Sequence, residues 1–252
     1  MAENGHVTID IQNGIATITF FHPKKNSLPG NLLAELARGV ESLGANDNAK
    51  VIVLQSEGEG PFCAGASFDE LLAIENFEQG KTFFMGFARL ILAMKQCPKF
   101  VIARIQGKAV GGGVGVASAA DYTLATDRAA IKLSELALGI GPFVVGPAVE
   151  RKIGNGPFGA LSIDTGWRDA AWAKTHGLYA DVFDSIEKLD TAVAALAQKL
   201  AQSSPEAMAK LKATFWKGTE HWDELLESRA EMSGKLVLSE FTSQAIAAFK
   251  GK

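Results

Sequence analysis

The sequence has little cysteine, no excess of basic residues and no long apolar run. Its two cysteines, Cys63 and Cys97, cannot form a framework of disulfide bridges and lack the spacing of metal ligands, so we expect free thiols in a cytoplasmic protein. The net charge of −3 gives no basic surface, and nucleic acid is not an expected partner. Glycine, lysine or arginine interrupts the longest apolar runs well short of a membrane span, and no leader pattern opens the chain. We therefore expect no membrane association.

Several catalytic motifs are also missing. The four histidines form no HExxH or paired arrangement, so we expect no metal site. There is neither the GxSxG of serine hydrolases nor a Walker A phosphate-binding sequence. The triplet Gly111-Gly112-Gly113 does not fit the dinucleotide-binding GxGxxG, because Val116 stands at the third glycine. A nucleotide-binding Rossmann fold is therefore not favoured.

Apolar periodicity predicts alternating strands and helices over roughly the first 150 residues, which is typical of a layered α/β core. Asn13-Gly14 joins two alternating runs, residues 7–12 and 15–21, and predicts a β-hairpin. The other strands predicted here are residues 51–54, 99–105, 122–125 and 130–133. The helices predicted here start near Leu32 and cover residues 68–74 and 78–96.

From about residue 158 onward the pattern is mostly helical. Ser204-Pro205 predicts the start of one helix, because proline is favoured at the first helical position. A last helix is predicted at residues 239–249. The four tryptophans fall in these segments, and we expect them to pack in the core: Trp167, Trp172, Trp216 and Trp222.

Two loops of small residues each follow an apolar strand and precede a helical segment: Cys63-Ala64-Gly65-Ala66 and Gly111-Gly112-Gly113. Such loops leave backbone N–H groups pointing outward at the positive end of a helix. Together they would make a two-donor site for a carbonyl oxygen that gains negative charge, where one donor is worth about 10²–10³ in rate. The alternative is that the glycines only permit close helix packing, and spacing alone does not choose between the two.

Glu135 is the candidate for proton transfer. It lies between an apolar strand and Leu136-Ala137-Leu138, where a carboxylate has little structural reason to be. Apolar surroundings raise the pKa of a carboxyl group toward neutrality, which suits acid–base catalysis. A structural carboxylate, which caps a helix or pairs with a cation, is the alternative.

At these residues the chain resembles the enoyl-CoA hydratase/isomerase (crotonase) superfamily. The similar segments follow one another in the family's order over essentially the whole chain: His22-Pro23 after the hairpin, Phe62-Cys63-Ala64-Gly65-Ala66, Gly111-Gly112-Gly113 with Asp121, Ser134-Glu135 with Leu138-Gly139, and residues 245–250. The resemblance implies an α/β fold in which residues 1–195 form a spiral of ββα units with an acyl-CoA site. It implies that residues 196–252 form a helical region that assembles a homotrimer, or a hexamer of two trimers.

The resemblance also implies a ligand and its contacts. The ligand would be an acyl-CoA thioester, with coenzyme A as part of the substrate and no further cofactor. The N–H groups of Ala66 and Gly112 would form the oxyanion hole for the thioester carbonyl. The coenzyme A site would include Lys24, Lys25, Ala64, Ala66 and Gly112, with Phe249 and Lys250 approaching the ligand of a neighbouring subunit.

Gly115 is the departure from the family that matters most for the reaction. Well-studied hydratases of the family have one glutamate there and a second at the place of Glu135, so a two-carboxylate scheme cannot be carried over. A single glutamate is similar to the Δ3,Δ2-enoyl-CoA isomerases. It is also similar to a bacterial branch of methylglutaconyl-type hydratases, which the run Gly141-Pro142-Phe143-Val144-Val145 resembles. Ser67 is a smaller departure, at a place where the family more often has aspartate.

The sequence thus leaves three functions open. The first is hydration of a 2-enoyl-CoA, and the second is isomerisation of a 3-enoyl-CoA with Glu135 as the sole base. The third is a non-catalytic acyl-CoA-binding homologue, against which Ala66, Gly112 and Glu135 argue because all three are present. We favour hydration, because of the resemblance to the bacterial branch.

Overall fold

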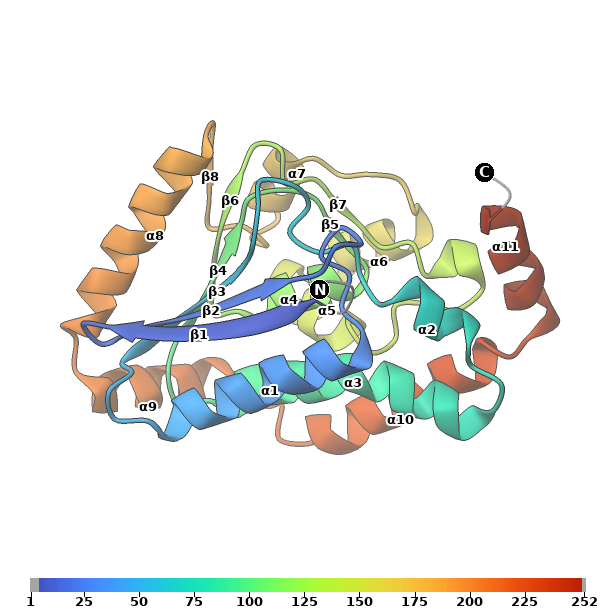
Figure 1. The fold of residues 1–252 in the computed structure, drawn as a ribbon, viewed down its shortest axis with the longest axis horizontal. Helices are drawn as coiled ribbons and strands as arrows, with labels where there is room; N and C mark the ends of the chain where they lie inside the picture. Colours follow the sequence, from blue (N-terminus) through green and yellow to red (C-terminus); the bar gives the residue numbers. More distant parts are fainter. Residues whose placement is uncertain (1–4, 251–252) are drawn as a thin grey trace.

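The computed structural model describes residues 5–250, and the side chains of residues 5–248. Its centre is a six-stranded sheet in the order β1-β2-β3-β4-β6-β8, parallel except for the β1–β2 hairpin (Figure 1). The strands are His6–Gln12 (β1), Ile15–Phe21 (β2), Val51–Ser56 (β3), Val101–Ile105 (β4), Tyr122–Thr126 (β6) and Asp181–Phe183 (β8). Asn13 and Gly14 take φ of 52° and 82° in the hairpin turn, which confirms the predicted hairpin.

A second, small sheet runs beside the large one. It pairs β5 (Ala109–Val110) with β7 (Ile131–Lys132) in parallel, and isolated bridges add Cys63 on one side and Arg168 on the other. Segments that leave the large sheet at β3, β4 and β6 each add a short stretch to the small sheet before the chain turns helical. This repeated strand–strand–helix order is the predicted spiral of ββα units.

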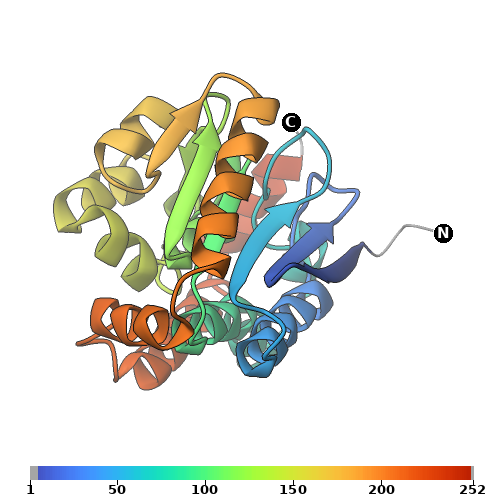
Figure 2. The same cartoon turned by 90° about the vertical axis from the view of Figure 1, so that its left-hand side faces the viewer.

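Helices cover both faces of the large sheet. One face carries α8 (Ile186–Ala201), which Figure 2 shows in front of the sheet. Residues of β3 alternate between the two faces, with Val51 and Val53 packed toward α8 and Ile52 and Leu54 in the main core. Because β3 is buried on both faces, its first four residues form a continuous apolar run, Val51–Leu54.

The remaining helices pack on the other face, around the small sheet, or beyond β8. They are Gly30–Ala45 (α1), Phe68–Leu72 (α2), Phe77–Gln96 (α3), Gly112–Ala119 (α4), the 3-10 turn Leu136–Leu138 (η1), Gly146–Ile153 (α5), Asn155–Ile163 (α6), Ala170–Thr175 (α7), Pro205–Phe215 (α9), Trp222–Leu236 (α10) and Glu240–Lys250 (α11). No helix in the described part of the chain has the length and apolar character needed to cross a membrane.

The C-terminal helices dock on the core at defined places. The Ser204 hydroxyl accepts a hydrogen bond from Ala207 N (3.3 Å) with Pro205 at the first helical position, which confirms the predicted start of α9. Helix α10 packs along α3, where Gly80 and Gly234 meet so closely that a Cβ on Gly80 would lie 2.9 Å from Gly234 O. The predicted boundary at residue 195 falls inside α8, and the division of the chain into two regions stays a prediction. The role of the helical region in oligomer assembly stays a prediction as well.

The prediction of mostly helical structure after residue 158 is confirmed, although this part of the chain also contains one short strand. A strand, β8, lies within the segment that the pattern made mostly helical, and it pairs with β6. Three residues are too few for a period of two to be visible in a sequence, so only the pairing with β6 defines this strand. The strand predicted at residues 130–133 is also shorter in the structure, because β7 is limited to the two residues that pair with β5.

Candidate active site

A cavity of about 890 Å³ opens between the small sheet, α2, α3 and the segment that surrounds η1. Its volume is in the usual range for small-molecule sites, which is roughly 300–1,000 Å³. Five of the residues predicted for the site line it: Lys25, Ala64, Ala66, Gly112 and Glu135. The structure therefore brings together loops that are far apart in the sequence.

The glycine triplet lies close to the predicted acid. Gly111 has φ 52° and ψ −115°, a conformation that side chains rarely allow, and a Cβ there would lie 2.9 Å from Glu135 Oε1. Gly112 begins α4, and a Cβ on it would lie 2.2 Å from Cε1 of Phe87 on α3. These glycines thus allow a carboxylate and an aromatic ring to press against the start of α4.

The loop that carries Ala66 lies beside this triplet. Leu28 N donates to Gly65 O (2.8 Å) and Ser67 N donates to Leu28 O (3.3 Å), so the pairing with Leu28 uses the residues on either side of Ala66. A Cβ on Gly65 would lie 4.0 Å from Gly112 N. Within residues 5–250, no acceptor lies in hydrogen-bond reach of the N–H of Ala66 or of Gly112. Two free donors therefore belong to neighbouring loops that both line the cavity.

Glu135 is half-buried as a residue, and its carboxylate lies at the buried end of the side chain. Among the described residues its Oε2 has no hydrogen-bond partner, and its side chain does not cap η1. Burial raises the pKa of Glu135 from 4.5 to about 7, an effect that the N–H groups of Glu135 and Ser134 only partly offset. Both protonation states are then populated near neutral pH. Within the described residues Glu135 caps no helix and belongs to no ion pair, so the alternative of a capping or paired structural carboxylate finds no support there.

Val145 explains the departure at Gly115. A Cβ on Gly115 would lie 2.5 Å from Cγ1 of Val145, which is itself buried and lines the cavity. A carboxylate at position 115 therefore requires Val145 to move. Of the described residues that line the cavity, Glu135 is the only acid.

The predicted lysines of the coenzyme A site have different surroundings. Lys25 lines the cavity, from a loop in which Lys25 and Asn26 take positive φ and the Asn26 side chain donates to the carbonyls of Glu57 and Pro61. Lys24 does not line the cavity and forms an exposed ion pair with Asp69 of α2. Ser67 caps the same helix by accepting from Glu70 N (3.3 Å), a local reason for a serine at this departure.

Helix α11 approaches the cavity of its own chain. Ala245 and Ala248 line that cavity, and Ile246 packs in a small apolar cluster with Leu71 and Ile140. The side chains of Phe249 and Lys250 lie outside the described residues, so their predicted contact with a neighbouring subunit stays a prediction.

The residues that line the cavity without having been predicted for the site include Lys108, Lys132 and Trp167. The expectation that every tryptophan packs in the core holds for Trp216 and Trp222, which are 6% and 5% exposed, but is wrong for Trp167, which is 45% exposed. Trp167 precedes Arg168, whose bridge to Ile131 brings this segment to the small sheet. No local sequence signal indicates that bridge.

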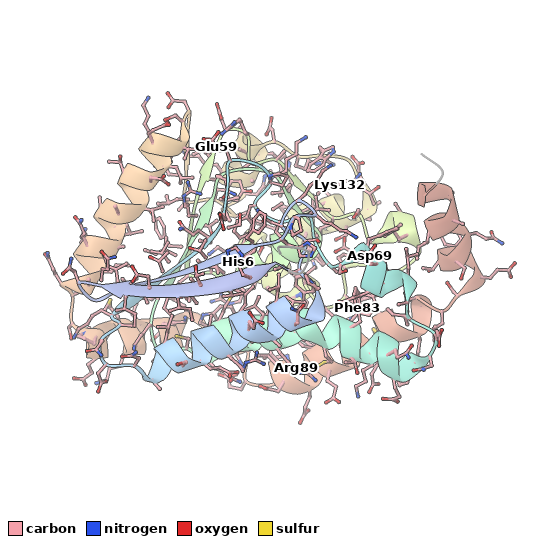
Figure 3. The ribbon with its side chains drawn as sticks, in the orientation of Figure 1. His6, Glu59, Asp69, Phe83, Arg89 and Lys132 are labelled. Atoms are coloured by element: carbon pink, nitrogen blue, oxygen red, sulfur yellow. The ribbon has the colours of Figure 1, made fainter. Side chains whose placement is uncertain are left out.

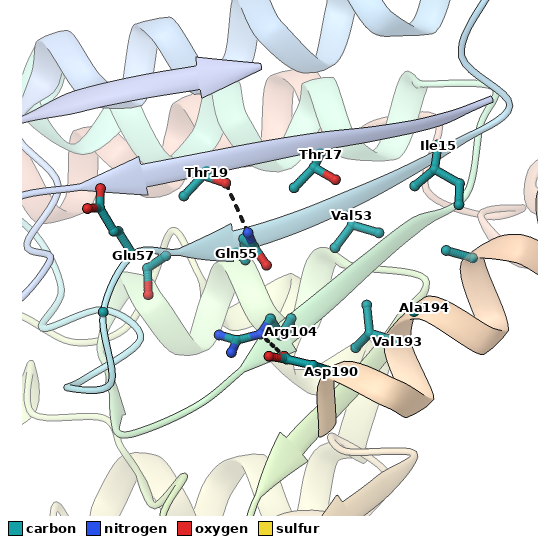
Figure 4. Close-up of a pocket in the computed structure, with 13 residues that line it drawn as sticks. Ile15, Thr17, Thr19, Val53, Gln55, Glu57, Arg104, Asp190, Val193 and Ala194 are labelled. Carbon is teal, nitrogen blue, oxygen red and sulfur yellow. Dashed lines mark hydrogen bonds and ion pairs between the residues drawn. The ribbon is translucent and has the colours of Figure 1, made fainter. Parts of the chain in front are cut away.

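A second hollow, of about 440 Å³, lies on the other face of the large sheet beside α8 (Figure 4). Four of its polar side chains pair with one another, since Arg104 of β4 contacts Asp190 of α8 and Gln55 donates to Thr19 Oγ1 (3.0 Å). It contains neither Glu135 nor the two glycine-rich loops. The larger cavity is therefore the candidate active site.

Comparison with known proteins gives one family. The profile described as Enoyl-CoA hydratase/isomerase matches residues 10–252. The rat protein named methylglutaconyl-CoA hydratase, mitochondrial, is 32% identical over 200 residues, which cover 78% of this chain but only 63% of the rat protein, less than two thirds of its length. A Bacillus subtilis protein named probable enoyl-CoA hydratase is 27% identical over 98% of this chain and 96% of its own.

Solved structures agree with the fold. An enoyl-CoA hydratase from Bacillus halodurans superposes with a TM-score of 0.89 at 23% identity, over 96% of this chain and 99% of that one. A structure from Acinetobacter baumannii, titled as a putative enoyl-CoA hydratase/isomerase, superposes with a TM-score of 0.85 at 22% identity, over 95% and 100%. At these identities the likeness establishes the fold, which is the α/β spiral predicted from the sequence.

Proposed function

The chain belongs to the enoyl-CoA hydratase/isomerase family, and on this premise we propose that it hydrates a 2-enoyl-CoA with Glu135 as the acid–base group. Membership of the family makes it an enzyme of the hydratase or isomerase type that acts on an acyl-CoA thioester. The observation that carries the choice of Glu135 is its buried Oε2, which has no partner within the described residues, in a cavity lined by Gly111 and Gly112. The pKa of about 7 lets this carboxylate both accept and return a proton near neutral pH.

The proposed reaction adds one water across the 2,3-double bond. The water oxygen bonds to C3 while one water proton passes to the Glu135 carboxylate, and the electrons of the double bond move toward the thioester oxygen. The N–H groups of Ala66 and Gly112 stabilise that developing enolate oxygen. Glu135 then transfers the proton to C2, which gives the 3-hydroxyacyl thioester and restores the carboxylate. The scheme needs no group beyond the substrate and its coenzyme A.

Two similarities support hydration over other reactions of the same cavity. Relatives that match over most of this chain carry hydratase names, and the rat relative is named for a methylglutaconyl thioester. The segment Phe143-Val144-Val145, which resembles the bacterial branch, lines the cavity beside Gly115.

Isomerisation is the second candidate, and Val145 favours it. Because Val145 occupies the space beside Gly115, a second carboxylate is not available to position a water. In this reaction Glu135 removes a proton from C2 of a 3-enoyl thioester, the same N–H groups stabilise the dienolate, and the proton returns at C4. One base is sufficient for this transfer.

The test uses two substrates, crotonyl-CoA and a 3-enoyl-CoA, and follows the absorbance of the conjugated thioester. Loss of absorbance with crotonyl-CoA is the expected result and indicates hydration. A gain of absorbance with the 3-enoyl-CoA, without loss from crotonyl-CoA, replaces hydration by isomerisation. No change with either substrate, in protein that binds coenzyme A in a calorimeter, overturns both and leaves a non-catalytic binder.

We further propose that the C-terminal helices assemble a trimer, or two trimers. The support is a set of exposed apolar side chains on or next to α10 and α11: Met232, Leu236, Leu238 and Phe241. Light scattering on the purified protein tests this proposal, and a monomeric mass contradicts it.

The cytoplasmic location stays a prediction; the two cysteines are free, as expected.

A further inference from the structure

Two lysines and a tryptophan form a cationic cluster on one wall of the cavity. Lys108 Nζ lies 4.8 Å from the centroid of the Trp167 ring, and Lys132 Nζ lies 5.8 Å from the same centroid. Both distances are within the range of a cation–π contact. All three residues line the cavity, and neither the family comparison nor the proposed reaction uses them.

The small sheet explains why these side chains share one face. Cys63, Ala109 and Ile131 are paired across the sheet and are fully buried in the core. Successive residues of a strand point to opposite faces, so Lys108, next to Ala109, and Lys132, next to Ile131, point away from the core. Trp167 lies beside them, because it precedes Arg168, which is bridged to Ile131. The alternation thus aims both ammonium groups at the cavity.

Neither lysine has an anionic partner in the protein. Among the ion pairs of residues 5–250, none includes Lys108 or Lys132, whereas the nearby Lys24 is paired with Asp69. Glu135 is the only acid among the described lining residues, and its Oε2 contacts neither lysine. Two like charges over one indole ring repel each other, and an anion bound between them would remove that repulsion.

The rest of the cavity wall is different in character. The part formed by α2 and α3 is apolar and carries Leu71, Phe83, Phe84 and Phe87. In the view of Figure 3, Lys132 lies above Asp69 of α2 and Phe83 lies below it. A ligand that fills this cavity therefore has an apolar part and, apart from it, an anionic part.

We propose that Lys108 and Lys132, held over Trp167, form a subsite for an oxyanion carried by the thioester, a phosphate or a carboxylate. The lysines and Trp167 bind and position this group and take no part in the proton transfer. The inference rests on the proposed function, because that function supplies the thioester. Two sources present such an oxyanion: the phosphates of coenzyme A, and a carboxylate on the acyl group.

The first experiment removes the charges. The double variant Lys108→Met and Lys132→Met keeps the length of both side chains and is expected to raise KM for the thioester about tenfold or more, because hydrogen bonds to charged groups are stronger than those between neutral groups. Its kcat is expected to stay within about twofold, because Glu135 and the glycine-rich loops are untouched. Lys199→Met on α8, on the far face of the large sheet, is the matched control and should leave KM unchanged.

Three thioesters, each made with a neutral acyl group and with one that ends in a carboxylate, identify the source of the oxyanion. They are the esters of coenzyme A, of dephospho-coenzyme A and of N-acetylcysteamine, which has no phosphate. A rise in KM that is confined to the phosphate-bearing esters assigns the subsite to a phosphate. A rise that persists with N-acetylcysteamine esters, but only when the acyl group ends in a carboxylate, assigns it to the acyl group. Equal KM for variant and wild type on every ester overturns the subsite.

Replacement of Trp167 tests its positioning role. Trp167→Leu removes the ring and is expected to raise KM toward the value of the lysine variant, whereas Trp167→Phe keeps a ring for the cation–π contact and is expected to restore most of the affinity. A purely structural tryptophan would instead lower thermal stability without separating leucine from phenylalanine in KM. If the wild-type enzyme converts none of the thioesters, the proposed function fails; if it converts them and the lysine variants match it, only the subsite fails.

Discussion

Two buried carboxylates lie at opposite ends of helix α4, and the protein surrounds them in opposite ways. Asp121, just after the helix, accepts from Lys212 Nζ (2.8 Å), from Val101 N (2.8 Å) and from Trp216 Nε1 (3.2 Å). Glu135, against Gly111 at the start of the helix, has no partner for Oε2 in residues 5–250. Both acids belong to the segments by which the chain resembles its family.

The difference separates a structural acid from a reactive one. Asp121 and Lys212 have side chains 5% and 2% exposed, and their pairing joins α9 to the core. A buried charge is tolerated there because donors surround it. Because no partner stabilises the charged form of Oε2 at Glu135, burial raises the pKa of this residue to about 7. Keeping such a group buried costs stability, a cost that a fully paired structural acid avoids.

Replacement of the reactive acid should have the largest effect. Glu135→Gln keeps the shape of the side chain but cannot accept a proton, and we expect turnover to fall about 10²–10⁴-fold, the usual worth of an acid–base group. The measurement is kcat for the better of the two substrates, together with calorimetric binding of coenzyme A as a control for the fold. Turnover close to that of the wild type would remove Glu135 from the mechanism.

Removal of the partner of the structural acid should act on stability instead. Lys212→Met leaves Asp121 buried without its cation, and we expect the free energy of unfolding to fall by about 3–5 kcal/mol in urea titrations. Lys210→Met on the same helix removes an exposed pair with Glu206 and should cost less than about 0.5 kcal/mol. Similar losses for the two variants would contradict the structural role of Asp121.

The pH dependence of stability should also distinguish the two acids. Glu135 binds its proton more tightly in the folded chain, with a pKa of about 7 against 4.5 in the unfolded chain, so its contribution to stability is lost as pH rises from about 4.5 to 7. We expect Glu135→Gln to be more stable than the wild type by about 1–3 kcal/mol near pH 8 and by little near pH 4.5. Urea unfolding at both pH values measures this, and a variant less stable than the wild type near pH 8 would refute it.

The smallest effect concerns the place where a second acid is missing. Gly115→Ala puts a methyl group against Val145, and we expect a loss of about 1–3 kcal/mol from overpacking. Adding Val145→Ala should recover part of this loss, because it reopens the space. Thermal unfolding of both variants checks the prediction. A fully stable Gly115→Ala would mean that Val145 gives way easily and does not exclude a carboxylate.

The sequence predicted more of the site than of its surroundings. The two loops of small residues and Glu135 were predicted because each interrupts the local sequence pattern. The loops place small residues, and Glu135 places an acid, where the apolar periodicity would otherwise continue. Lys108, Lys132 and Trp167 gave no such signal, since lysines beside short strands and a tryptophan before a helix are ordinary. Likewise β8 is too short to show a period, and only its pairing with β6 makes it a strand.

The sequence by itself determined the α/β order, the hairpin, the start of α9 and the residue types of the site, because these depend on contacts between near neighbours in the chain. Only the tertiary structure decided that Oε2 of Glu135 has no partner within residues 5–250, that Val145 occupies the space beside Gly115, and that two lysines share one tryptophan. Burial and the absence of a partner are properties of a whole neighbourhood. That neighbourhood forms from segments tens of residues apart, which local sequence patterns do not relate to one another.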